Sequence, residues 1–126
     1  MSVSSEVYIG YTIELEPDVD KVGWKKIHNF EDKYPEIDKY NHHWEDREGK
    51  VLLVADGMCG TFARLIWVDK YRDGASLGDS NEYFKLAEAE CEDKDCKIAE
   101  LTKYYRLYTG DESEPKIEYA MWSLWV

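Results

Sequence analysis

The chain opens on an alternation of apolar and polar positions. Within residues 7–15 every second side chain is apolar, namely Val7, Ile9, Tyr11, Ile13 and Leu15. Successive side chains of a β-strand point to opposite faces of the sheet, so a period of two predicts a strand with one buried face. We expect the residues between them to line the other face of the same strand.

Residues 16–35 change to helical spacing. The apolar residues that fall near this spacing are Val19, Val22, Ile27, Phe30 and Tyr34. Pro17 suits a first helical turn and Pro35 marks an end, because proline is tolerated only where its missing N–H is not needed. We expect one helix here, weakened by Gly23 by about 1 kcal/mol relative to alanine.

The middle of the chain, residues 37–71, alternates between apolar runs and turn residues. Residues 50–57 (KVLLVADG) form an unbroken apolar run of the kind found in central strands. Residues 61–71 (TFARLIWVDKY) predict a second long strand. Residues 40–45 (YNHHWE) are a further candidate strand before the turn-forming segment DREGK.

Apolar residues return to helical spacing from Phe84 to Tyr108. Two alternatives fit, a single helix over about 81–108 or two helices that meet near residues 92–96, in either case capped by Asp79 or Ser80. Gly110 is a suitable C-terminal stop. Residues 116–126 predict a final strand. The last six residues are so apolar that we expect the strand to be interior or paired with another subunit.

This succession of elements predicts an α+β fold, a mainly antiparallel sheet with two helices packed on one face. If residues 40–45 are not a strand, the order becomes the ferredoxin-like βαββαβ arrangement. The length of 126 residues is near the commonest domain size, so we expect a single domain over 1–126.

The charge balance narrows the choice of partners. The formal net charge is −11, with 27 acidic residues against 16 Lys and Arg. Such a chain is repelled by nucleic acid and by anionic membranes, so it should bind basic partners or none; solubility alone is the simpler explanation. The sequence has no apolar run long enough for a membrane helix and no secretory signal pattern. Three cysteines, an odd number, favour reduced thiols and a cytoplasmic location.

Candidate catalytic and metal-binding groups are few. His42 and His43 are adjacent, so on a strand they would point to opposite faces and could not easily bind one metal ion. Cys59 lies in a glycine-flanked turn but has no recognisable base nearby. Asp56, Asp69 and Asp73 flank the two middle strands, as expected by chance among so many acids. We expect no catalytic residue, no metal and no cofactor.

The N-terminal segment MSVSSEVYIGYTIELE resembles the start of a group of small, mostly uncharacterised phage accessory proteins, which begin with a Ser-rich tip and a Val-Tyr-Ile-Gly strand. The resemblance covers about a dozen residues and departs after Gly10, where those proteins tend to have proline and this chain has Tyr11. It implies a phage origin and, with it, binding and blocking of a host protein such as a defence nuclease. It assigns no catalytic residue.

The first functional hypothesis is a non-enzymatic binding protein that uses acids and tyrosines to occupy a basic surface, such as the nucleic-acid site of a host enzyme in the host cytoplasm. Some tyrosines near acids or at helix edges could serve such an interface or complete the core: Tyr8, Tyr83, Tyr104, Tyr105 and Tyr108. The candidate partner-binding residues form one acidic run and a second acidic patch: Glu82, Tyr83, Glu88, Glu90, Glu92, Asp93 and Asp95, with Asp111, Glu112 and Glu114.

Two other hypotheses stay open. One is a small-molecule or nucleotide-binding protein, or a small enzyme, in which His42 or Cys59 is reactive. Its pocket would be lined by Trp24, His42, Trp44, Trp67 and Tyr71. The other is an oligomer, such as a homodimer, joined through the C-terminal strand or the long helix.

Overall fold

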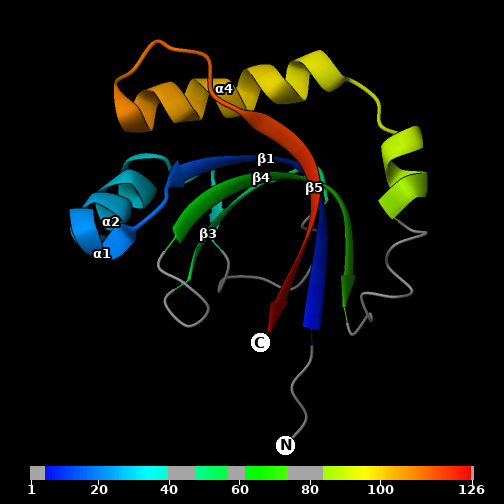
Figure 1. Ribbon diagram of the computed structural model, residues 1–126, viewed down its shortest axis with the longest axis horizontal. Coiled ribbons are helices and arrows are strands. Elements are labelled where there is room, and N and C mark those ends of the chain that lie inside the picture. The colour runs from blue at the N-terminus through cyan, green and yellow to red at the C-terminus, as the bar shows by residue number, and fades with distance from the viewer. Residues whose placement is uncertain (1–4, 40–47, 57–61, 74–83, 126) are drawn as a thin grey trace, which may run out of the picture.

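The computed structural model describes residues 5–39, 48–56, 62–73 and 84–125 (Figure 1). In this part of the chain the strands form one sheet in the spatial order β2-β3-β4-β1-β5. The strands are β1 (Ser5–Glu16), β2 (Asp38–Lys39), β3 (Val51–Asp56), β4 (Phe62–Asp73) and β5 (Ile117–Trp125). The four long strands pair antiparallel, and the short β2 pairs in parallel with β3.

Helices cover one face of this sheet (Figure 1). They are α1 (Val19–Val22), α2 (Trp24–Lys33), a helical segment at residues 84–89 and α4 (Lys94–Thr109). The largest core cluster joins Ile27 and Phe30 of α2 and Leu101 of α4 to Tyr11 and Ile13 of β1. The predicted α+β class, antiparallel sheet and one-sided helix layer are therefore confirmed.

The chain departs from the ferredoxin-like βαββαβ order. Both helical regions are divided, and the additional strand β2 precedes β3 and lies at the edge of the sheet. Residues 40–45, on which that alternative depended, lie outside the described residues.

The alternation predicted for the first strand is confirmed. Val7 and Ile9 face Ala87 of the helical segment, and Tyr11, Ile13 and Leu15 belong to the core beneath α2 and α4. Tyr8 packs on the opposite face with a second buried cluster, which contains Leu52, Val54, Ile66 and Val68. Because β3 is buried on both faces over residues 51–54, its sequence reads as a nearly continuous apolar run.

The single helix predicted for residues 16–35 is wrong. Gly23 has φ +88°, a left-handed value that glycine adopts without steric cost, and it ends α1 and starts α2. The Gly23 N–H closes α1 by donating to the Val19 carbonyl, 2.7 Å away. The second helix ends before Pro35, as expected.

Of the two alternatives for the second helical region, the divided one is confirmed. The helical segment 84–89 and α4 are separated by residues 90–93, and α4 ends at Gly110. The cap residues Asp79 and Ser80 lie outside the described residues.

The final strand is placed at the edge of the sheet rather than in its interior. Within the described residues β5 pairs only with β1, over nine consecutive positions from Ile117 to Trp125. Its side chains before residue 122 are partly exposed or exposed. The strand therefore lies at an edge among the described residues, and the side chains of residues 122–126, on which the expectation of an interior or subunit-paired strand mainly rested, lie outside the description.

Gly10 provides a test of how closely β1 and β4 approach. A Cβ at this position would lie 1.8 Å from the carbonyl oxygen of Trp67, a backbone atom that cannot move aside without breaking the sheet. We expect Gly10→Ala to lower the free energy of unfolding by about 3 kcal/mol or more in urea titrations. Gly110→Ala is the matched control, because open space surrounds that position and only its φ of +71° opposes a side chain, at about 1 kcal/mol. Equal losses would contradict the close approach.

Candidate functional site

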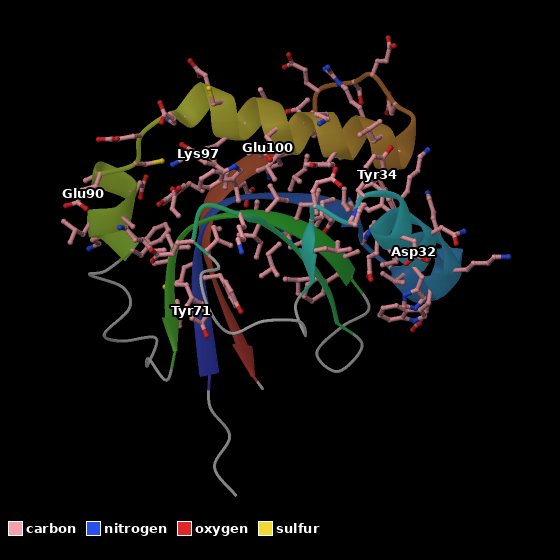
Figure 2. The ribbon with its side chains drawn as sticks, turned by 180° about the vertical axis from the view of Figure 1, so that it is seen from behind. Asp32, Tyr34, Tyr71, Glu90, Lys97 and Glu100 are labelled. Atoms are coloured by element: carbon pink, nitrogen blue, oxygen red, sulfur yellow. The ribbon has the colours of Figure 1, made fainter. Side chains whose placement is uncertain are left out.

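The site begins with an irregularity in the pairing of β1 with β4. Ile9 pairs with Lys70 and Gly10 with Val68, so Asp69 is left without a partner on β1. One extra residue in one strand is a β-bulge, which redirects the side chains that follow it. Asp69 and Lys70 both line a hollow under the helices, whereas Tyr71 packs against Tyr8 on the opposite face. Figure 2 shows Tyr71 across the sheet from Lys97.

Asp69 forms a largely buried ion pair with Lys97. The Lys97 Nζ donates to Asp69 Oδ1 at 2.6 Å, and the two side chains are 11% and 8% exposed. The Nζ also lies 4.7 Å from the ring centroid of Trp67. Burial opposes protonation of Lys97, but the hydrogen bond and negative charge of Asp69 outweigh it and raise the pKa of Lys97. The pair thus ties the first turn of α4 to the bulge in β4.

Cys91 completes this cluster as a thiol. Its Sγ donates to Asp69 Oδ2 at 3.2 Å and lies 3.7 Å from Lys97 Nζ. Burial, followed by the hydrogen bond and the negative charge of Asp69, raises the pKa of Cys91. Since the thiolate is the nucleophilic form of cysteine, this environment is unsuited to nucleophilic catalysis. The thiol instead fixes residue 91, which lies between the helical segment 84–89 and α4.

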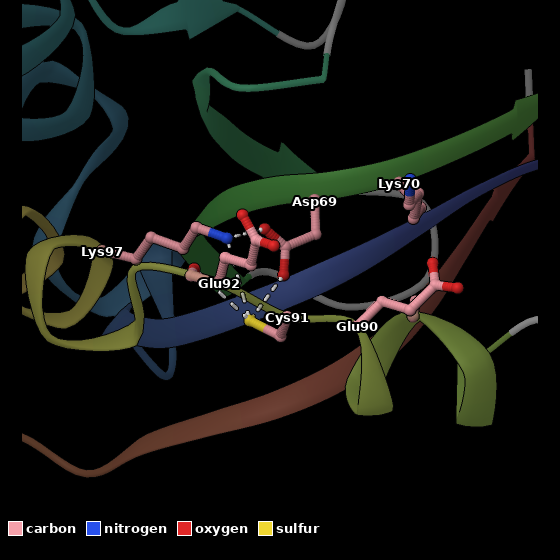
Figure 3. Close-up of a pocket in the computed structure, with 7 residues that line it drawn as sticks. Asp69, Lys70, Glu90, Cys91, Glu92 and Lys97 are labelled. Atoms are coloured by element: carbon pink, nitrogen blue, oxygen red, sulfur yellow. Dashed lines mark hydrogen bonds and ion pairs between the residues drawn. The ribbon is translucent and has the colours of Figure 1, made fainter.

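A hollow of about 210 Å³ lies beside this cluster (Figure 3). Asp69, Cys91 and Lys97 line it together with Lys70, Ala87, Glu90 and Glu92. The hollow is therefore lined mainly by charged side chains, which include the carboxylates of Glu90 and Glu92. Ala87 is the apolar residue among those that line it.

Residues 88–95, two of which line the hollow, carry a group of exposed carboxylates that we call the acidic corner. It consists of Glu88, Glu90, Glu92, Asp93 and Asp95. Within the described residues none of these five carboxylates forms an ion pair. The last two lie at the N-terminus of α4, where the helix dipole favours negative charge.

The backbone of the acidic corner is fixed at several points. Asp93 has φ +53°, and its carbonyl accepts the N–H of Lys97 at 3.1 Å. The Glu90 N–H donates to the Leu86 carbonyl at 3.0 Å. With Cys91 bound to Asp69, the turn between the two helices is held at both ends.

The other predicted acids lie elsewhere. Asp111, Glu112 and Glu114 follow the C-terminus of α4, a helix of 16 residues and therefore about 24 Å long. The Asp111 carboxylate accepts the N–H and the hydroxyl of Ser113, both at 2.9 Å, which lowers the pKa of Asp111. The two acidic groups are thus separate surfaces. Glu82 and Tyr83 lie outside the described residues.

The tyrosines that sequence reasoning associated with an interface are mostly core residues. Tyr104 and Tyr108 are buried, and their hydroxyls donate to Glu36 at 3.0 Å and to Glu16 at 3.3 Å. Burial, together with these carboxylates, raises the pKa of each tyrosine to about 12. Both hydroxyls therefore hold α4 against the carboxylates that flank the first helical region, Glu16 before α1 and Glu36 after α2.

The described members of the predicted small-molecule pocket do not converge. Trp24 stacks near His28 on α2 and donates to Asp20 at 3.3 Å. Trp67 faces α4 and donates to Glu100 at 2.9 Å, whereas Tyr71 lies on the other face of the sheet. His42, His43, Trp44 and Cys59 lie outside the described residues.

Sequence reasoning missed the central group of the site, Lys97 with Cys91. Asp69 appeared only as one acid among many, because its partner is 28 positions away. The available signal was Gly10, since a glycine inside a strand often marks a bulge or a close backbone approach.

Fold and site together define a small α+β protein with exposed carboxylates arranged around a buried lysine–aspartate pair. No protein-family model, curated protein or solved structure matches the chain. Among the described residues no three His, Cys, Asp or Glu side chains are grouped to hold a metal ion. No helix in the described ranges is both long and apolar enough to cross a bilayer.

Removing one member of the buried pair should destabilise the fold. Lys97→Met leaves the Asp69 carboxylate buried without its cation, and we expect a loss of about 3 kcal/mol in the free energy of unfolding. Lys94→Met, an exposed lysine one turn earlier, is the control and should change it by less than about 0.5 kcal/mol. Adding Asp69→Asn to Lys97→Met should recover part of the loss. Equal stability of the two lysine variants would contradict the role assigned to the pair.

The thiol gives a prediction for alkaline pH. Because the folded chain holds the Cys91 proton more tightly than the unfolded chain does, stability should fall as pH rises above 9.0, the ordinary pKa of a thiol. The raised pKa values of Tyr11, Tyr104 and Tyr108 act in the same direction at higher pH. Chemical denaturation across this range should give a shallower decline for Cys91→Ser than for the wild type. Cys96→Ser, at an exposed position, should leave the decline unchanged.

Proposed function

We propose that the chain is a non-enzymatic binding protein whose acidic corner occupies a basic surface of another protein. The observation that carries this proposal is the set of five exposed carboxylates on a turn that is fixed by the buried Asp69–Cys91–Lys97 cluster. A rigid arrangement favours binding because less conformational freedom is lost when the complex forms.

The chemistry of the corner favours a nucleic-acid-binding partner. Carboxylates spread over a surface resemble the phosphates of a nucleic acid to a basic groove, and complementary charge accelerates association. The net charge of −11 adds a long-range attraction toward such a groove and opposes binding to nucleic acid itself. In its most specific form the proposal is a phage-encoded inhibitor that blocks a host protein such as a defence nuclease.

We assign the binding role to the acidic corner and not to Asp111, Glu112 and Glu114. Those acids lie at the far end of α4, and Asp111 is already engaged by Ser113. A basic surface that meets the hollow would contact Glu90 and Glu92. Neither of these carboxylates forms an ion pair with another described residue. The far loop therefore provides a matched set of acids for comparison.

A charge-neutral variant tests the proposal. The combined substitution Glu88→Gln, Glu90→Gln, Glu92→Gln and Asp93→Asn removes four charges while keeping the size of each side chain. In pull-downs from bacterial lysate at low salt, we expect this variant to retain about tenfold less nucleic-acid-binding protein than the wild type, a loss of about 1.4 kcal/mol. Added duplex DNA should release the bound protein, because both would compete for one basic surface, and high salt should do the same.

The comparison variant combines Asp111→Asn, Glu112→Gln and Glu114→Gln. It should bind as the wild type does, since its net charge changes by a similar amount but the acidic corner is intact. Equal losses for both variants would mean that only total charge matters. Bound protein that DNA does not displace would contradict occupation of a nucleic-acid site.

A further inference from the structure

The edge strand β5 is a second candidate binding surface, because one side of its backbone has no strand partner within the described residues. Along β1 it forms nine consecutive pairs without a register shift, from Ser5 opposite Trp125 to Ile13 opposite Ile117. No other strand of the described part pairs with β5, so the backbone groups on its outer side have no strand partner there. Figure 1 shows β5 running along the front of the sheet.

This edge lacks the features that usually protect one. Proteins commonly prevent edge pairing with charged residues, prolines, bulges or very short strands. Glu118 is the one charged residue of β5, and it pairs with Lys116, just before the strand, at 3.1 Å. Residues 119–126 contain no charge and no proline.

The helical segment 84–89 packs on the face of β5 and not along its outer edge. Phe84 lies against Tyr119 with ring centroids 5.6 Å apart, and Met121 joins the same cluster with Val7 and Ile9 of β1. These contacts cover the face that β1 and β5 share. Hydrogen bonds to an added strand form in the plane of the sheet. The contacts on the face of β5 therefore do not block such bonds to its backbone.

We propose that β5 pairs antiparallel with β5 of a second copy of this chain, which joins the two sheets into one across a twofold axis. An isologous contact of this kind places each residue of one copy opposite its counterpart in reverse order. In the register that uses the whole strand, Met121 lies opposite itself, Ile117 opposite Trp125, and Glu118 opposite Leu124. No charged residue of β5 then faces another.

The charge distribution favours a second copy as the occupant. Two chains of net charge −11 repel each other, so they can associate only through a surface that is locally neutral. The run 119–125 of β5 has no charged residue and is such a surface, and cross-strand pairing penalises like charges placed directly opposite. A basic partner would gain nothing from charge attraction at this run, whereas it would gain much at the acidic corner. The two surfaces therefore suit different partners.

Sedimentation velocity over a concentration series tests this pairing directly. The expected result is a rise from 14.8 kDa to twice that mass, with no larger species. A mass that remains at 14.8 kDa in the tens of micromolar range would overturn the proposal. Species that keep growing with concentration would overturn it as well, because a twofold contact closes at two copies. The charge-neutral variant of the acidic corner should dimerise at least as tightly as the wild type, because its copies repel each other less, whereas its binding to a basic partner should fall; this separates the test from that of the proposed function.

A pair of proline variants tests the role of the β5 edge. Successive N–H groups of an antiparallel strand point to alternate sides, so of Ala120→Pro and Met121→Pro one removes a hydrogen bond to β1 and the other removes an outward N–H. We expect one variant to melt at a lower temperature at every concentration and the other to stay folded but monomeric. If the folded variant still dimerises, the β5 edge is not the contact.

Hydrogen exchange on the wild-type chain covers the case in which both prolines unfold it. At dimer-forming concentration, alternate amides of residues 117–125 should exchange more slowly than in dilute solution, because the outward N–H groups are then bonded to the second copy. Exchange rates that are equal at both concentrations would overturn the proposal.

Discussion

The buried ion pair between Lys97 and Asp69 is the interaction on which the junction of the helical segment 84–89 and α4 depends. A charge removed from water is costly unless it is paired and hydrogen-bonded. Here one carboxylate receives both the ammonium of Lys97 and the thiol of Cys91, at 2.6 Å and 3.2 Å. These donors come from α4 and from the turn before it, so satisfying one carboxylate also fixes how the two helical pieces join. The exposed acids of the corner are carried by that junction.

The charged hollow beside this pair in turn depends on the irregular pairing of β1 and β4. If β4 continued in regular alternation after Trp67, Asp69 would share the face of Trp67 and Lys70 would point to the other face, and Tyr71 would face the helices again. The bulge brings Asp69 and Lys70 to one hollow and sends Tyr71 to pack against Tyr8. Gly10 permits this because the Trp67 carbonyl occupies the space of a Cβ. Gly10, which has no reactive group of its own, thus determines that the side chain of Lys70 points into the same hollow as Asp69.

These dependencies explain which parts of the structure the sequence could predict. The faces of β1 and the stop at Gly110 follow from local rules of period and backbone freedom, whereas the break between the two C-terminal helical pieces stayed one of two alternatives. Gly23 was recognised as a weak point, but local propensity alone could not decide between a strained helix and two helices. The Asp69–Lys97 pair and the edge position of β5 are products of tertiary pairing. Nothing within a few residues of Asp69 distinguishes it from the other acids of the chain.

The two proposed surfaces reinforce each other when they are considered together. The acidic corner lies on the helical layer, whereas the outer side of β5 lies in the plane of the sheet, so the two proposed contacts use different parts of the molecule. A dimer with two rigidly linked corners would bind a partner that has two basic sites more tightly than one corner could, because the second contact forms within one complex. The gain depends on geometry and vanishes if the basic sites cannot both be reached. Dimerisation at a neutral edge would therefore select among basic partners that a single acidic corner would bind alike.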